Sequence, residues 1–194
     1  MRLVATLLLL AAARAGAAAT ILVVEVRDLH GAAVQDAVVY AVPEAKRPPL
    51  PSRRAVLDQK NRMFVPHVLP IQAGTAVTFP NSDNVRHQVY SFSAAKRFQL
   101  PLYSGTPATP VVFDKPGVVA VGCNIHDQMS AYIVVVDTPY FALTTGGRAE
   151  LPGLPEGNYD VRVWYAGMRR ELLPQPVSLG ANEQKSLTFQ VGPQ

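Results

Sequence analysis

The residues with the clearest capacity for chemistry lie in one short stretch, Gly122-Cys123-Asn124-Ile125-His126-Asp127-Gln128-Met129. It offers a thiol, an imidazole and a thioether within a few positions of one another. A second imidazole, His87, lies far upstream, at the end of the run that begins with Phe79-Pro80-Asn81. Two imidazoles and one thiolate form a trigonal donor set, and a weakly held thioether completes it as the axial ligand. Proteins use this set to bind copper for electron transfer. The sequence therefore predicts a metal site at His87, Cys123, His126 and Met129.

The mixture of soft and intermediate donors favours copper over other metals. Thiolate and thioether sulfur stabilise Cu(I), whereas imidazole also suits Cu(II), so one rigid geometry can hold both oxidation states. Gln128 is an alternative axial ligand because its amide oxygen lies next to Met129 in the chain. We favour Met129, since a soft and weak axial ligand fits this type of site better.

Cys123 is the only cysteine of the chain, so it has no intramolecular disulfide partner. A buried cysteine that acts only as a small apolar side chain is the simplest alternative to a metal ligand. A cysteine hydrolase with a histidine base is a third interpretation. It is disfavoured because it leaves the second histidine and Met129 without a role.

The first nineteen residues predict export from the cytoplasm. Arg2 precedes an apolar run from Leu3 to Ala13, and Ala17-Ala18-Ala19 supplies the small residues of a signal-peptidase site. We expect residues 1–19 to be a signal peptide and the mature protein to be periplasmic or otherwise exported. The apolar run is too short for a membrane span, which needs about 20 residues, although an uncleaved anchor is the alternative. No later run is long enough, so no stable membrane span is expected after cleavage.

Composition narrows the class of protein further. Hydrophobic residues make up 48% of the chain and charged residues 16%, which is typical of a folded protein and not of a disordered one. The formal net charge is +4, and two of the positive charges, Arg2 and Arg14, lie in the expected signal peptide. This charge is too small to indicate nucleic-acid binding.

The pattern after Thr20 is that of an all-β protein, because short runs rich in Val, Ile, Tyr and Phe alternate with turn residues. A helical turn is expected only at Ala94 to Arg97. The runs predict strands at Ile21–Val26, Ala37–Val42, Val68–Gln72, Ala76–Phe79, His87–Phe92, Val111–Phe113, Val118–Cys123, Ala131–Val136, Tyr159–Trp164 and Ser186–Val191.

Two interruptions divide this pattern into domains. Residues 45–54 form a Pro-rich, basic linker, and Asp137-Thr138-Pro139 follows the last apolar run of the middle section. We expect one β-sandwich over residues 55–137. Residues 20–44 and 138–194 are each too short to close a sandwich, so we expect them to form a second small sandwich into which the first is inserted, or to which it is appended.

Two motifs in the middle section resemble a known family. The runs Phe79–Ser93, FPN-x-D-x-x-x-H-x-VYSFS, and Pro116–Ile133, PG-x-V-x-x-GCNIHD-x-M-x-AYI, are similar to those of exported bacterial plastocyanin-like or methylamine-utilisation-type proteins. These proteins resemble the cupredoxins, the blue-copper family, and the Cys-x-x-His-x-x-Met spacing is similar to that of amicyanin. The resemblance implies a Greek-key β-sandwich over residues 55–137.

The flanking segments resemble transthyretin-like, carboxypeptidase-regulatory-like domains. The resemblance rests on the hairpin pattern between Val24 and Tyr40 and on the run Leu151-Pro152-Gly153 to Val163, which is similar to L-P-x-G-x-Y-x-V-x-V.

The cupredoxin resemblance implies a function and a ligand set. It implies one type 1 copper ion with His87, Cys123 and His126 as equatorial ligands and Met129 as the axial ligand. Asn81 and Asn124 are expected to support the ligands, Asn81 through a bond to the backbone near Cys123, although an ordinary turn Asn is the alternative. The expected function is single-electron transfer to redox partner proteins without enzymatic turnover. A copper-binding or copper-delivery module without redox turnover is the alternative function.

Overall fold

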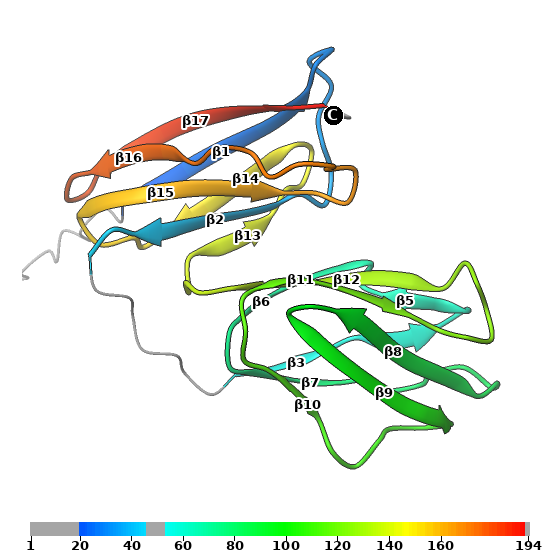
Figure 1. Cartoon of the computed structure of the whole chain (residues 1–194). Helices are drawn as coiled ribbons and strands as arrows, with labels where there is room; N and C mark the ends of the chain where they lie inside the picture. The colour runs from blue at the N-terminus through cyan, green and yellow to red at the C-terminus, as the bar shows by residue number, and fades with distance from the viewer. Residues whose placement is uncertain (1–19, 46–52, 193–194) are drawn as a thin grey trace, which may run out of the picture.

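The computed structural model describes residues 20–45 and 53–192, and within them every regular element is a strand. Figure 1 shows two β-rich bodies, one built from β3 to β12 and the other from the first two and the last five strands. No helix in the described part of the chain has the length and apolar character needed to cross a bilayer. The predicted signal peptide, residues 1–19, and most of the predicted linker lie outside the described residues.

The body that carries the candidate ligands is a sandwich of two main sheets. The larger sheet has the order β6-β12-β11-β8-β9, with the bounds Val68–Gln72, Ser130–Val136, Gly117–Gly122, His87–Ser93 and Lys96–Tyr103. The smaller sheet has the order β10-β7-β3, with the bounds Val111–Phe113, Thr75–Thr78 and Arg54–Val56. A separate hairpin joins β4 (Asp58–Lys60) to β5 (Met63–Val65).

The alternating pattern of side chains directs His87 into this sandwich. Successive residues of a strand point to opposite faces, and in β8 His87, Val89 and Ser91 are buried, whereas Phe92 is exposed. Val119 and Val121 of β11 face the same core. Its centre includes three packed aromatic rings, those of Phe79, Phe98 and Phe113.

The second body is a sandwich formed by the two flanks of the chain. One sheet has the order β14-β1-β17, with the bounds Arg148–Pro152, Ile21–Asp28 and Gln184–Val191. The other has the order β13-β2-β15-β16, with the bounds Phe141–Leu143, Val38–Pro43, Gly157–Trp164 and Gln175–Leu179. Their inner faces form one buried apolar cluster that includes Leu22, Val161 and Phe189. The Tyr159 hydroxyl donates to the carbonyl of Pro155, 2.8 Å away, which fastens the turn before β15.

A smaller apolar cluster joins the two bodies. It contains Val38 from the flanks and Val134 and Val136 from β12. The rings of Tyr132 and Trp164 pack beside it, with centroids 5.2 Å apart. β12, which follows the loop with the candidate ligands Cys123, His126 and Met129, is thus also the strand that contacts the second body.

All ten predicted strands are present, and the expected all-β sandwich fold is confirmed. The expected helical turn at Ala94 to Arg97 is wrong: Ala94 and Ala95 form the turn between β8 and β9, and Lys96 already belongs to β9. The strands missed by the sequence pattern are short or lie at sheet edges, where prolines such as Pro101 and Pro176 are tolerated and apolar runs are not required. The domain boundaries and the transthyretin-like character of the flanks stay predictions.

Candidate metal centre

Three of the four predicted ligands come together at one end of the five-stranded sheet. His87 is the first residue of β8, Cys123 directly follows β11, and His126 lies in the loop that leads to β12. Because β8 and β11 are neighbours, with Tyr90 opposite Gly122, the start of one strand lies beside the end of the other. Sheet pairing therefore closes a gap of 36 positions along the chain between His87 and Cys123.

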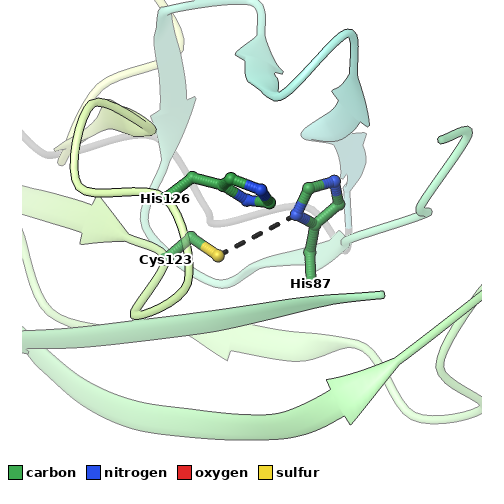
Figure 2. Close-up of side chains that lie close together, drawn as sticks. All are labelled: His87, Cys123 and His126. Atoms are coloured by element: carbon green, nitrogen blue, oxygen red, sulfur yellow. Dashed lines mark hydrogen bonds between the residues drawn. The ribbon is translucent and has the colours of Figure 1, made fainter. Parts of the chain in front are cut away.

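The side chains point toward a common space, as Figure 2 shows. The Sγ atom of Cys123 lies 3.9 Å from Nδ1 of His87. One ligand atom from each of the three residues lies within 4.8 Å of the other two. The two imidazole rings have centroids 5.0 Å apart and meet at 62°, so they do not stack on each other.

This geometry fits a bound metal ion. Bonds from a first-row metal such as zinc to imidazole nitrogen and thiolate sulfur are about 2.0–2.3 Å long, which separates two such donors in a trigonal plane by about 3.7 Å. The observed distance between Cys123 Sγ and His87 Nδ1 is close to that value. In addition, Nδ1 of His126 is buried and has no hydrogen-bond partner among the described residues. A buried polar atom left without a partner costs about 1–3 kcal/mol, and a metal bond would remove that cost.

Burial differs between the donors. His87 and Cys123 are 0% and 4% exposed, whereas His126 is partly exposed and reaches the protein surface. Met129 is 1% exposed and belongs to the same core cluster as Cys123, whereas Gln128 is exposed. The thioether therefore lies on the inner side of the loop, and the amide lies on the solvent side.

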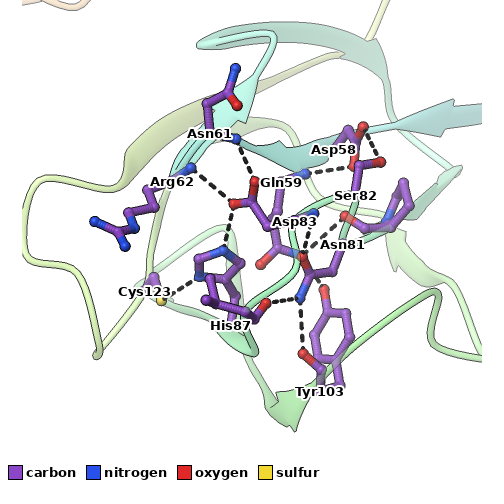
Figure 3. A network of polar contacts seen from close by, with 12 residues as sticks. Asp58, Gln59, Asn61, Arg62, Asn81, Ser82, Asp83, His87, Tyr103 and Cys123 are labelled. Carbon is purple, nitrogen blue, oxygen red and sulfur yellow. Dashed lines mark hydrogen bonds and ion pairs between the residues drawn. The ribbon is translucent and has the colours of Figure 1, made fainter.

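Asp83 contacts His87 on the side away from the cysteine, as Figure 3 shows. Its Oδ2 lies 2.7 Å from Nε2 of His87, so the second ring nitrogen is occupied by a carboxylate. The same carboxylate accepts hydrogen bonds from the backbone N–H groups of Asn61, at 2.6 Å, and Arg62, at 2.9 Å. Asp83 is therefore partly buried and bonded to a candidate ligand, although it lies in a bend of the chain. The spacing of four positions to His87 was the only signal in the sequence.

Burial by itself would raise the pKa of Asp83, but the hydrogen bonds from Arg62, His87 and Asn61 outweigh it. They hold the pKa of this carboxyl below its ordinary value, so Asp83 is ionised at neutral pH.

Asn81 acts at a different place from the one expected. Its side-chain amide donates to the carbonyls of Val85, at 2.9 Å, and Tyr103, at 3.0 Å, and its oxygen accepts from the N–H of Asp83. Asn81 therefore fastens the loop before His87 to β9, and the predicted bond to the backbone near Cys123 is wrong. Asn124, in the loop after β11, donates its side-chain amide to the side-chain oxygen of Gln88, 2.8 Å away, and so links that loop to the strand that begins at His87.

Beneath this loop lies a buried polar layer that the sequence did not reveal. Gln59 is fully buried, and its amide donates to the carbonyl of Pro80 and to the hydroxyl of Tyr103. That hydroxyl donates in turn to the carbonyl of Phe79. Burial raises the pKa of Tyr103 to about 12, so the phenol stays protonated and keeps both contacts.

The other two histidines lie outside the cluster. His67 is exposed, and its Nδ1 lies 3.1 Å from the carbonyl of Ser130. His30 is in an exposed turn next to Gly31.

No family model and no curated protein matches the chain. Among solved structures, it is similar to a copper-containing nitrite reductase from Thermus scotoductus SA-01, with 28% identity over 48% of this chain and 25% of that chain and a TM-score of 0.39. It is also similar to a purple cupredoxin from Nitrosopumilus maritimus, with 24% identity over 42% of this chain and 99% of that one and a TM-score of 0.38. A mutant amicyanin in its reduced Cu(I) form shows 20% identity over 50% of this chain and 98% of that one, with a TM-score of 0.39.

The chain thus spans about a quarter of the length of the nitrite reductase and nearly all of the two smaller proteins. Because these TM-scores lie below 0.4, the assignment of the metal centre depends on its own geometry. The His87, Cys123 and His126 cluster points to copper binding. The structural neighbours of this all-β chain are cupredoxins, the family that the motifs around His87 and Cys123 resemble.

Proposed function

We propose that this protein is an exported type 1 copper protein that carries single electrons between redox partners and is not itself an enzyme. The proposed equatorial ligands are His87, Cys123 and His126, with Met129 in the axial position. The observation that carries the proposal is the convergence of a buried thiol and an imidazole from the loop after β11 with a second imidazole from the start of β8.

The donor set supports electron transfer because the ion, when bound, supplies a one-electron Cu(I)/Cu(II) couple that thiolate and imidazole ligands both stabilise. The chain contributes rigidity. His87 is held by Asp83 on its far side. Asn124 bonds to Gln88, so the loop that carries Cys123 and His126 is tied to the strand that begins at His87. Ligands that are already in place need little rearrangement when the charge of the site changes.

Access for a partner supports the same function. His126 is partly exposed, and the neighbouring side chain of Ile125 is 50% exposed. An exposed apolar side chain beside a partly exposed ligand gives another protein a close contact point that needs no charged group at that position to be desolvated. We propose that redox partners contact the protein at this surface.

The test is spectroscopic. The mature protein is loaded with Cu(II), and its visible absorption and electron paramagnetic resonance spectra are recorded. In the visible spectrum we expect an intense thiolate-to-copper charge-transfer band, and in the paramagnetic resonance spectrum a small copper hyperfine splitting. Voltammetry of the same sample should then show a reversible one-electron wave. A pale solution with an ordinary tetragonal signal and no reversible wave would contradict electron transfer and favour the alternative function, copper storage or delivery.

The axial ligand gives a second, separate prediction. We expect Met129→Leu to retain copper but to raise the reduction potential. Loss of an electron donor destabilises the more highly charged Cu(II) more than Cu(I), and this effect outweighs the preference of thioether sulfur for Cu(I). A tenfold change in the ratio of the affinities for Cu(I) and Cu(II) corresponds to a shift of about 59 mV in a one-electron reduction potential. Gln128→Leu, at the exposed neighbouring position, should leave the potential unchanged. A shift in Gln128→Leu and none in Met129→Leu would assign the axial position to Gln128.

A further inference from the structure

The contact between Asp83 and His87 places a carboxylate beside a candidate ligand that has no access to solvent. The His87 side chain is 0% exposed and that of Asp83 is 11% exposed, with 2.7 Å between Nε2 and Oδ2. Charge-assisted hydrogen bonds of this kind are stronger than neutral ones, and low solvent exposure strengthens them further.

The position of the Asp83 carboxylate is itself determined by the backbone. Asn61 and Arg62 have φ values of +55° and +57°, which turns two successive N–H groups of the β4–β5 hairpin toward the same carboxylate. A third backbone group, the N–H of Asp83, is held by the side chain of Asn81. With both oxygens occupied, the carboxylate cannot rotate away from His87 without breaking several hydrogen bonds.

This arrangement determines which nitrogen of His87 carries the proton. Asp83 accepts hydrogen bonds, so Nε2 of His87 must be the N–H, which leaves the lone pair on Nδ1. Nδ1 is the nitrogen that faces Cys123 Sγ. The imidazole is therefore in the tautomer that binds metal before any metal arrives.

An anion on the far side of a ligand imidazole also makes that imidazole a stronger electron donor. Donation stabilises the more highly charged form of a bound ion, which for copper is Cu(II). The effect resembles the carboxylate–histidine pairs that support other metal sites, where loss of the supporting group lowers metal affinity by about 10–100-fold.

We propose that Asp83, held by the turn at Asn61 and Arg62, is a positioning residue that fixes the tautomer of His87 and biases the site toward Cu(II). The inference rests on the proposed function for its physiological meaning, because an oxidation-state bias matters most in an electron carrier.

The experiment compares Asp83→Asn with the control Asp58→Asn. Asp58 is a nearby carboxylate that bonds to Ser82 and to the N–H of Gln59, and these contacts do not include the ligands. Competition with chelators specific for Cu(I) and for Cu(II) gives both dissociation constants for each protein. We expect Asp83→Asn to weaken Cu(II) binding about tenfold more than Cu(I) binding, which raises the potential by about 59 mV. Asp58→Asn should change the ratio by less than about twofold.

The metal-free protein provides a readout that does not involve copper. Long-range proton–nitrogen correlation spectra report the tautomer of each histidine. We expect His87 of the wild type to carry its proton on Nε2, and we expect Asp83→Asn to lose this single tautomer. A wild-type His87 protonated on Nδ1, or an affinity ratio equal in the two asparagine variants, would overturn the inference.

A conservative variant distinguishes an effect of the charge of residue 83 from an effect of the loop conformation. It also gives a result that can be interpreted if the asparagine variant misfolds. Asp83→Glu keeps the carboxylate, and we expect its affinity ratio to lie within about threefold of that of the wild type. If Asp83→Glu changed the ratio of Cu(I) to Cu(II) affinity as much as Asp83→Asn does, the change would come from the shape of the loop and not from the charge of Asp83. That result would overturn the proposed role of the charge.

Chelator competition requires no redox cycling. A tetragonal spectrum would therefore contradict the proposed function, while the affinity ratios and the tautomer would still decide the role of Asp83.

Discussion

Cys123→Ser is expected to abolish the intense visible absorption of the copper-loaded protein and to weaken copper binding about 100-fold or more. A serine hydroxyl does not ionise near neutral pH, so the site loses its anionic sulfur donor and the charge-transfer transition that requires it. Removal of a group that only supports a ligand lowers metal affinity by about 10–100-fold. The loss of copper affinity on removal of a ligand itself should be at least as large. Absorption spectra and copper titrations of the variant and the wild type measure both changes.

The fold should survive this substitution. Cys123 is a free, buried residue, and serine has nearly the same size and can bond to Nδ1 of the adjacent His87. Circular dichroism checks this point. His67→Ala is the matched control, because His67 is an exposed histidine outside the cluster. Undiminished visible absorption in Cys123→Ser would rule out Cys123 as a copper ligand.

Phe113→Ala is expected to destabilise the ligand-bearing sandwich by about 3–5 kcal/mol. Phe113 is fully buried, and its ring packs against Phe98, at a centroid distance of 5.8 Å, and Phe79, at 6.5 Å. Removal of the ring takes apolar area out of the core and leaves a cavity that rigid neighbouring strands cannot fill. Urea titration followed by near-ultraviolet circular dichroism measures the free energy of unfolding.

Phe92→Ala is the control for this prediction. Phe92 belongs to the adjacent sheet but is 72% exposed, so its loss should change the stability by less than about 0.5 kcal/mol. Similar losses in the two variants would mean that the three-ring cluster is not the centre of the core. Lower copper affinity in Phe113→Ala without lower stability would mean that the ring positions the ligands directly.

The polar contacts around Asp83 show how the sandwich supports the candidate metal centre. Asn81 bonds to β9, Gln59 and Tyr103 hold the carbonyls of Phe79 and Pro80, and the hairpin turn holds Asp83. The loop before His87 is thus fixed from three directions. Such support keeps a ligand in place in both oxidation states of a bound ion, which is what low rearrangement requires.

Much of the fold was predictable because alternation of apolar and polar residues is a local property. The pattern in His87–Phe92 and Val118–Cys123 gave strands close to their observed bounds, since period-two burial follows directly from strand geometry. Edge strands such as β9 and β16 were missed because one side of an edge strand needs no partner, so its sequence need not be apolar or free of proline.

The amino-acid sequence by itself determined the candidate donor set: the types and spacing of Cys123, His126 and Met129, and the strand that begins at His87. These features depend on side-chain chemistry and on short-range geometry, which a single stretch of chain expresses. Only the tertiary structure decided that Asp83 holds His87, that Asn81 bonds to β9, and that the N–H groups of Asn61 and Arg62 reach Asp83. Hydrogen bonds between loops depend on how separate strands pair and pack, and the order of residues along one segment does not carry that information.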